Sequence, residues 1–150
     1  MRTVIASDHA GFYFKEKIFQ SLVDEGIRMT NLGTHSTDPV DYPDIARDVG
    51  EMVAARRADR GILICGSGVG VSVVANKIPG IRAGLCHDTY SARQGVEHDD
   101  INVLVLGARV IGPELALELV RTFLAARFSG EERHVRRLGK VKEMERKYCK

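Results

Sequence analysis

The sequence predicts an α/β fold: a single Rossmann-like three-layer αβα sandwich around a five-stranded parallel sheet, with an extra helix at the C-terminus. Two observations carry this prediction. Short β-branched runs alternate with segments of helical spacing along most of the chain. One of these runs, 61–65, is apolar throughout, as expected of a central parallel strand that is covered on both faces. The alternation favours right-handed crossovers within one domain spanning 1–150.

The expected elements follow from apolar spacing and from turn residues. We expect strands over residues 3–6, 27–32, 61–65, 82–86 and 103–107. The first helix should turn inward the apolar side chains Ile18, Phe19, Leu22 and Val23. Asp41 is the expected N-cap of the second helix, which has Pro43 in its first turn. The remaining helices are expected over residues 71–77, 89–96, from 113 onward and about 133–148.

Composition excludes several classes of protein. The chain has 150 residues, 44% of them hydrophobic and 28% charged, which is typical of a globular domain and not of a disordered one. The net charge is only +2, so no basic field covers the body of the molecule. Trp is absent and aromatic residues make up 6%, which leaves few platforms for stacking nucleobases. We therefore expect no nucleic-acid partner.

The cysteines and the apolar runs predict a cytoplasmic protein. The three cysteines are far apart and lack the spacing of a zinc site, which favours a reducing compartment. The apolar run near Met1 is too short for a signal peptide. The longest uncharged stretch, 61–76, contains four glycines and falls short of the roughly 18–20 apolar residues of a membrane helix. No membrane association is expected.

Ligands of open parallel sheets bind outside the carboxyl ends of the strands. The expected strands place five polar groups there or nearby: Asp8-His9, the loop 65–70, His87-Asp88, the turn 107–109 and, just before the last strand, His98-Asp99. These groups are the candidates for a functional site.

The loop Gly66-Ser67-Gly68-Val69-Gly70 follows a strand and opens a helix. Such a loop points backbone N–H groups at one place and can hold a phosphate or a reacting oxyanion. It is not a good dinucleotide fingerprint, because Val71 occupies the third glycine position. No Gly-Lys-Ser/Thr follows, which excludes a P-loop. A plain tight turn remains an alternative.

Cys65 directly precedes this loop. Amide dipoles and a helix N-terminus favour the thiolate form of cysteine, so Cys65 is a candidate base or nucleophile. Cysteine is also among the most frequently buried residues, and core packing is the competing interpretation. Ser67 is similarly either a catalytic hydroxyl or a turn residue.

The other candidates also have two interpretations. Asp8 and His9 either supply a carboxylate and an imidazole to the cleft or form a helix cap beside a surface histidine. His98 is either an acid or base that acts near neutral pH or part of a polar loop. Arg109 either binds a phosphate or lies on the surface.

The last 20 residues are basic, with 8 basic and 4 acidic side chains, whereas residues 1–130 carry 14 and 16. Arg133 and Arg137 are four residues apart on a predicted helix, so both guanidinium groups can reach one phosphate. A solvated charged face is the ordinary alternative. Nucleic-acid binding is less favoured, because four glutamates interrupt the charge.

Taken together, the motifs resemble the type B ribose-5-phosphate isomerase family, which also contains the galactose-6-phosphate isomerase subunits. The matching segments occur in order over nearly the whole chain: Ser-Asp-His-Ala-Gly at 7–11, Gly-Thr at 33–34, Val-Asp-Tyr-Pro-Asp at 40–44, Gly-Ile-Leu-Ile-Cys-Gly-Ser-Gly-Val-Gly at 61–70, Ala-Asn-Lys at 75–77, Gly-Ile-Arg-Ala at 80–83, Asn-Val-Leu at 102–104, Arg-Val-Ile-Gly at 109–112 and Arg-His-x-x-Arg at 133–137. Each segment is weak alone, and the combination is specific.

The resemblance implies an aldose–ketose isomerase that acts on a phosphorylated pentose through a cis-enediolate, without a metal or an organic cofactor. It implies Cys65 as the base, Ser67 as the group that assists transfer at the substrate oxygens and His98 as the acid for ring opening. The implied binding residues are Asp8, His9, Gly66, Gly68, Val69, Gly70, Asp99, Arg109, Arg133 and Arg137. It also implies a homodimer or homotetramer whose sites lie between subunits, with the C-terminal helix reaching a neighbour.

The sequence departs from the family where Arg-x-His-Asn is common, because it reads Val96-Glu97-His98-Asp99. Asp99 accepts hydrogen bonds but lacks the amide donors of Asn. The departure leaves a second enzyme open, an isomerase of a hexose 6-phosphate such as allose 6-phosphate or galactose 6-phosphate. A non-catalytic module that binds nucleotide or phosphate is a third and less favoured hypothesis.

Overall fold

The computed structural model describes residues 1–149, and a five-stranded parallel sheet lies at its centre. The strand order is β2-β1-β3-β5-β4. The strands are β1 (Thr3–Ser7), β2 (Met29–Gly33), β3 (Arg60–Cys65), β4 (Ala83–Leu85) and β5 (Val103–Gly107). The predicted parallel sheet is therefore confirmed. The second strand begins two residues later than expected, and the fourth is shortened to three residues.

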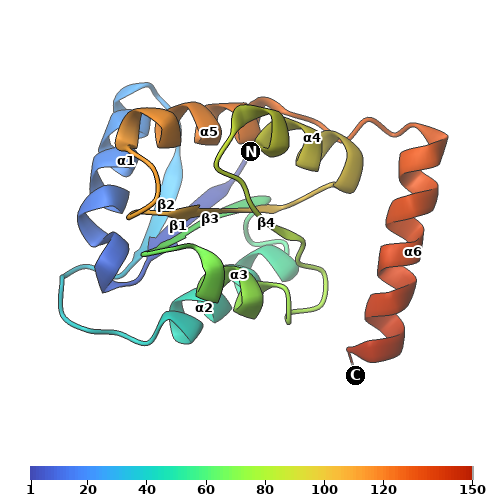
Figure 1. Ribbon diagram of the computed structural model, residues 1–150, viewed down its shortest axis with the longest axis horizontal. Helices are drawn as coiled ribbons and strands as arrows, with labels where there is room; N and C mark the ends of the chain where they lie inside the picture. The colour runs from blue at the N-terminus through green and yellow to red at the C-terminus, as the bar shows by residue number, and fades with distance from the viewer. Residues whose placement is uncertain (150) are drawn as a thin grey trace.

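Helices cover both faces of the sheet and form the three predicted layers (Figure 1). The helices α1, α4 and α5 lie on one face, and α2 and α3 lie on the other (Figure 1). Their bounds are α1 (Phe12–Asp24), α2 (Tyr42–Ala54), α3 (Val69–Ala75), α4 (Thr89–Asp99) and α5 (Pro113–Ala125), and a short 3-10 turn, η1 (His9–Gly11), precedes α1. None of the helices described within residues 1–149 has the length and apolarity to cross a membrane.

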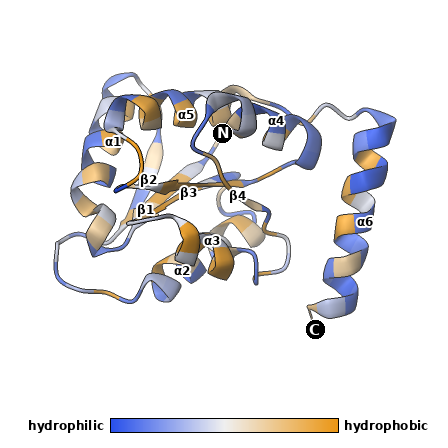
Figure 2. Cartoon of the chain, in the orientation of Figure 1, coloured by the Kyte–Doolittle hydropathy of each residue, from blue (hydrophilic) through white to orange (hydrophobic). Residues whose placement is uncertain are grey.

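Alternate residues of the strands pack into two separate hydrophobic cores, one on each face of the sheet. On the central strand, Ile62 and Ile64 pack toward α1, α4 and α5, whereas Leu63 and Cys65 pack toward α2 and α3. The apolar colouring of the strands between more polar outer surfaces is visible in Figure 2. Every residue of β3 is buried, which confirms it as a central strand covered on both faces.

The predicted inward faces of the helices are mostly correct. Ile18 and Leu22 of α1 are fully buried, and so are Ala116, Leu119, Val120 and Phe123 of α5. Val23 was expected to point inward, and this prediction is wrong, because its side chain is 40% exposed. It follows Leu22 by one position, which turns it about 100° around the helix and off the buried stripe.

The C-terminal helix α6 (Glu132–Tyr148) stands beside the sandwich and does not join either layer (Figure 1). Of its residues, only His134 and Leu138 are buried. The point where the chain leaves α5 is fixed by Arg60, whose guanidinium donates to the carbonyl oxygens of Phe123 and Ala126. These carbonyls lie at the C-terminal end of α5, where no helical N–H can satisfy them.

The ammonium group of Lys15 is completely buried and holds the loop after β2 against α1. Its Nζ donates to Glu16 Oε1 and Asn31 Oδ1 at 2.7 Å each and to the Thr34 carbonyl oxygen at 2.8 Å. The hydrogen bond from Lys15 is the main cause that lowers the pKa of Glu16. Three acceptors thus compensate the desolvation of one buried charge.

Replacing this ammonium should cost stability. We expect Lys15→Met, which keeps the apolar stem, to lower the free energy of unfolding by about 3 kcal/mol, because three oxygens lose a shared donor. Urea unfolding at neutral pH measures the change. The control is Lys17→Met on the same helix, where the exposed side chain should give less than about 0.5 kcal/mol. Equal effects of the two substitutions would contradict the role of Lys15.

Candidate active site

A cavity of about 430 Å³ opens at the carboxyl edge of the sheet, where the sequence predicts the ligand site. Its walls come from the ends of β1, β3 and β5 and from the start of α2. The lining residues are Asp8, His9, Ala10, Tyr42, Cys65, Gly66, Ser67, Gly70, Arg109 and Val110. The structure thus brings together seven of the predicted site residues: Asp8, His9, Cys65, Gly66, Ser67, Gly70 and Arg109.

Cys65 ends β3, is 6% exposed and packs in the core, and it also lines the cavity. Its Sγ accepts a hydrogen bond of 3.1 Å from the backbone N–H of Gly68. Gly68 adopts a φ of +82°, which glycine tolerates without strain.

The rest of the glycine loop surrounds this thiol. Ser67 is exposed, and its Oγ accepts from the Val69 N–H at 3.2 Å. The Val69 side chain is 55% exposed and does not line the cavity. Gly70 lies against the Tyr42 ring, since a Cβ there would come within 2.8 Å of it. The loop therefore presents backbone and a hydroxyl to the cavity, with an aromatic ring as one wall.

Asp8 and His9 line the same cavity and are both held by backbone N–H groups. Asp8 is 8% exposed, and its Oδ1 accepts from the Gly11 N–H at 3.1 Å, so the capping interpretation is confirmed. The His9 Nδ1 accepts from the Val40 N–H at 3.2 Å. An imidazole that accepts at Nδ1 carries its proton on Nε2, so His9 can donate that proton to a ligand.

Arg109 supplies a cation to this cavity. The turn after β5 is tied to the glycine loop by the Arg109 N–H, which donates to the Gly66 carbonyl oxygen at 2.9 Å. The side chain lies across Gly66, with Nη1 3.5 Å from the place of a Cβ on that residue. Within residues 1–149, no carboxylate forms an ion pair with Arg109. Its charge is therefore available to an anionic ligand.

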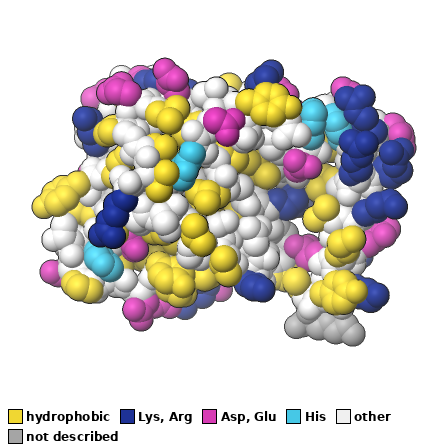
Figure 3. All heavy atoms as spheres, viewed as in Figure 1, with side chains coloured by type: hydrophobic (Ala, Val, Ile, Leu, Met, Phe, Trp, Pro, Cys, Tyr) yellow, Lys and Arg dark blue, Asp and Glu magenta, His cyan; other side chains and the backbone are white. Residues whose placement is uncertain are grey.

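Apart from Gly68 and Val69 of the glycine loop, four predicted residues do not line this cavity: His98, Asp99, Arg133 and Arg137. They gather where α4 meets α6. The His98 ring stacks on the His134 ring with 3.9 Å between centroids, and its Nδ1 lies 2.8 Å from Gln94 Nε2. The exposed Asp99 follows His98. Figure 3 shows histidine side chains beside the Lys and Arg side chains of α6.

His134 organises this second cluster, and residue-by-residue reasoning did not single it out. It is 2% exposed. Its Nδ1 lies 2.6 Å from the Ser129 Oγ, and its Nε2 accepts from Arg133 Nε at 3.2 Å. Arg133 also pairs with Glu131 at 3.2 Å. The Arg-His-x-x-Arg motif contained this histidine, but only the packing of α6 on α4 reveals its contact with His98.

Tyr42 and Val110 are cavity residues that the site prediction also missed. Tyr42 lies in the matching segment Val-Asp-Tyr-Pro-Asp and Val110 in Arg-Val-Ile-Gly, so the family motifs already contained both residues. Val96 stands where the family commonly has Arg, and its side chain is fully buried in the core. It contributes packing and does not line the cavity.

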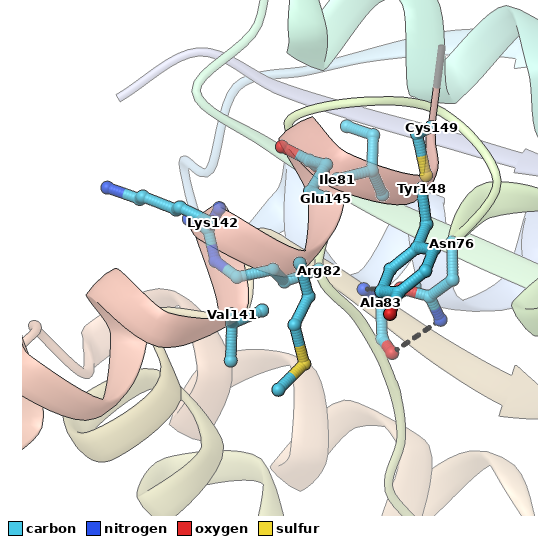
Figure 4. Close-up of a pocket in the computed structure, with 10 residues that line it drawn as sticks. Asn76, Ile81, Arg82, Ala83, Val141, Lys142, Glu145, Tyr148 and Cys149 are labelled. Carbon is cyan, nitrogen blue, oxygen red and sulfur yellow. Dashed lines mark hydrogen bonds between the residues drawn. The ribbon is translucent and has the colours of Figure 1, made fainter.

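A second cavity, of about 380 Å³, separates α6 from the residues around the start of β4 (Figure 4). The α6 side is formed by Val141, Tyr148 and their neighbours, and the facing side by Asn76 and Ile81 (Figure 4). Glu145 spans the gap, because its Oε1 accepts from the Gly80 N–H at 2.8 Å. This cavity contains none of the predicted site residues. Within residues 1–149, no group of three or more His, Cys, Asp and Glu side chains is arranged to hold a metal ion.

The fold and the Cys65 cavity define a Rossmann-like α/β protein with a thiol, a glycine loop and an arginine at the carboxyl edge of its sheet. Comparison with known proteins gives the family. The sequence pattern of the Ribose/Galactose Isomerase family matches residues 3–141, and the chain belongs to this family.

Three relatives illustrate the similarity. The structure of ribose-5-phosphate isomerase B from Clostridium thermocellum is 48% identical, with a TM-score of 0.95 over 99% of both chains. Ribose-5-phosphate isomerase B from Escherichia coli is 44% identical over 93% of each chain. D-erythrulose-4-phosphate isomerase from Pectobacterium atrosepticum is 42% identical over 84% of each chain.

The docking of α6 through His134 should depend on pH. Burial, followed by the nearby His98 and Arg133, lowers the pKa of His134 below its ordinary value of 6.5. Undocked His134 therefore binds a proton more readily than docked His134, so docking is strongest above pH 6.5 and weakens as the pH falls through the lowered pKa. We expect the α6 amides to lose hydrogen-exchange protection between about pH 7.5 and about pH 5.5, after correction for intrinsic rates. His134→Gln should flatten this dependence, and an unchanged dependence would contradict the assignment.

Proposed function

We propose that this chain interconverts D-ribose 5-phosphate and D-ribulose 5-phosphate by an aldose–ketose isomerisation through a cis-enediolate. The observation that carries the proposal is the Cys65 Sγ held at 3.1 Å by the Gly68 N–H, in one cavity with Arg109. A base, an amide donor and a phosphate-binding cation are the groups that this reaction requires. The names of the relatives from C. thermocellum and E. coli support the same substrate.

The proposed base is the Cys65 thiolate. It removes the proton from C2 of the open-chain aldose and returns it to C1, while the C1–O1 double bond becomes the enediolate and then the C2–O2 carbonyl of the ketose. Negative charge develops on the substrate oxygen in the enediolate. The N–H groups of the loop 66–70 stabilise this charge, and the exposed Ser67 hydroxyl moves a proton between O1 and O2.

The proposed substrate contacts use the remaining cavity groups. Arg109 binds the phosphate, and His9 donates from Nε2 to the phosphate or to a sugar oxygen. Asp8 accepts from a sugar hydroxyl with Oδ2, because its Oδ1 already accepts from Gly11. Binding energy at the phosphate, remote from C1 and C2, holds the reacting carbons beside the thiol. This chemistry requires neither a metal nor an organic cofactor.

A second copy of the chain completes the proposed site. His98 would be the acid for ring opening, Asp99 a sugar contact, and Arg133 and Arg137 further phosphate ligands, yet all four lie outside the Cys65 cavity of their own chain. The exposed apolar residues Val69, Val73 and Val110 lie on or beside this cavity, and α6 exposes Val135, Val141, Met144 and Tyr148. If both apolar surfaces are buried between subunits of a homodimer or homotetramer, the residues around His98 of one chain would lie near the thiol of its partner.

We place this activity in the cytoplasm, in pentose phosphate metabolism. The three cysteines, Cys65, Cys86 and Cys149, are free thiols, which agrees with a reducing compartment. Burial raises the pKa of Cys86 to about 11, so Cys86 remains a neutral thiol and does not compete as the base.

One observation favours a second substrate class, the hexose 6-phosphates. Asp99 stands where the family commonly has Asn, and it lies beside His98 in the proposed half-site. The buried Val96 gives this alternative no further support. The D-erythrulose 4-phosphate relative indicates that the same scaffold can act on sugars of another length.

The first test is turnover of ribose 5-phosphate in the presence of a chelator. We expect the wild-type chain to form ketose under these conditions. Cys65→Ala should lower kcat by at least about 100-fold with little change in KM, because it removes the base and leaves the phosphate contacts. Cys149→Ser, at an exposed thiol outside the cavity, should have wild-type activity.

Two results would contradict this assignment. Activity of Cys65→Ala equal to wild type would overturn the mechanism. Saturable nucleotide binding without any isomerase activity would instead support a binding module. Comparison of kcat/KM between ribose 5-phosphate and the 6-phosphates of allose and galactose decides between the two substrate classes.

The shared site can be tested by mixing two inactive variants. The first variant, Cys65→Ala, lacks the thiol. The second, with Arg133→Ala and Arg137→Ala, lacks two of the proposed phosphate ligands. Random exchange of subunits between these chains should restore about a quarter of wild-type activity, since half of the dimers are hybrids and each hybrid contains one intact site. If all groups of one site came from one chain, mixing would restore no activity.

A further inference from the structure

The imidazole of His87 has no role in the isomerase chemistry proposed above. It follows β4 at the carboxyl edge of the sheet, but it does not line the Cys65 cavity. Its neighbour Asp88 has a clear structural role as the N-cap of α4, where its Oδ1 accepts from the Ser91 N–H at 2.7 Å. The half-buried ring of His87 instead points its Nε2 at the end of β5.

His87 completes a hydrogen-bond ladder that β4 leaves unfinished. β4 pairs with β5 only as far as Leu85 opposite Val105, and the Cys86 N–H makes a last, long contact of 3.4 Å to the Val105 carbonyl oxygen. The chain then turns away, and the buried Gly107 N–H has no strand carbonyl on this side. The His87 Nε2 accepts from it at 3.0 Å. A buried N–H without an acceptor would destabilise the folded state.

The backbone of Gly107 packs directly against the glycine loop. A Cβ on Gly107 would lie 2.6 Å from the Ser67 carbonyl oxygen, and a Cβ on Gly68 would lie 3.3 Å from the Gly107 nitrogen. The two backbones are thus in direct contact, and the Ala108 N–H adds a bond of 2.8 Å to the Cys65 carbonyl oxygen. Any displacement of Gly107 would move the residue whose N–H donates to the Cys65 Sγ.

We propose that His87 is a positioning residue for this isomerase: its Nε2 fixes the Gly107 backbone and thereby the Gly68 N–H that faces the Cys65 sulfur. The inference depends on the proposed function for its catalytic consequence, whereas its structural consequence stands alone. The ring acts through Gly107 and contacts no reacting atom.

The protonation of His87 follows from this geometry. Nε2 must be unprotonated to accept from Gly107, and burial lowers the pKa of His87, which favours the neutral ring. The titratable residues next in the chain to His87 and Gly107 are Cys86, which stays neutral, Asp88, which caps α4, and Arg109, which lies across Gly66. Acidification below the lowered pKa would place a second N–H opposite the Gly107 donor and break the contact.

Two substitutions distinguish the loss of the hydrogen-bond acceptor from the loss of the imidazole ring. His87→Leu removes the acceptor, whereas His87→Gln can accept through Oε1 and does not titrate. We expect H87L to lower kcat/KM for ribose 5-phosphate by about tenfold and to accelerate hydrogen exchange of the amides at 66–70 by a similar factor. H87Q should remain within about threefold of wild type in both measurements. His35→Leu, at an exposed histidine outside the cavity, is the matched control and should change neither.

The pH dependence of hydrogen exchange at residues 66–70 tests the role of the His87 acceptor, because a purely structural role of the ring would not change it. After correction for intrinsic rates, exchange at 66–70 should accelerate in the wild type as the pH falls from about 7.5 to about 5.5. This acceleration should be smaller in H87Q, which decides the question even if H87L does not fold. Wild-type behaviour of H87L, or equal impairment of H87Q and H87L, would overturn the proposal. If the wild type does not isomerise ribose 5-phosphate, the proposed function fails, and the exchange measurements still test His87.

Discussion

The site depends on the continuation of the β3–β5 pairing beyond the strands. The last paired residues are Cys65 and Gly107, and the next two N–H groups of the β5 side, from Ala108 and Arg109, donate to the carbonyl oxygens of Cys65 and Gly66. The thiol, the glycine loop and the cationic turn are therefore built on one continuous ladder. Because this ladder begins between fully buried strands, the rigidity of the core extends directly to the groups that surround the cavity.

Much of the fold was predictable because its signals are local. Alternating β-branched runs and helical spacing gave all five strands, and the wholly apolar segment 61–65 gave the central one. The errors occurred where packing decides the outcome. β4 is short because the chain turns away after Cys86, and Val23 faces solvent because a single helical step separates it from the stripe that α5 covers.

The site was predictable only where its residues follow strands. Asp8, Cys65 and Arg109 could be placed at one edge because parallel strands all end there. Tyr42 reaches the cavity from the start of α2, and His134 meets His98 only through the docking of α6 on α4. Their positions depend on the angles between helices, which no local pattern specifies. The family motifs contained both residues without indicating what they touch.

The guanidinium of Arg60 has a consequence for how the molecule can diversify. Arg60 is the first residue of the strand that Cys65 ends. Its guanidinium binds a carbonyl oxygen at the C-terminal end of α5, where the chain continues toward α6. One rigid strand thus sets the position of the thiol at one end and the direction of the outlying helix at the other. Residues of α6 outside the proposed phosphate ligands and the exposed apolar surface can therefore accumulate substitutions, while the start of the helix keeps a constant position relative to the thiol.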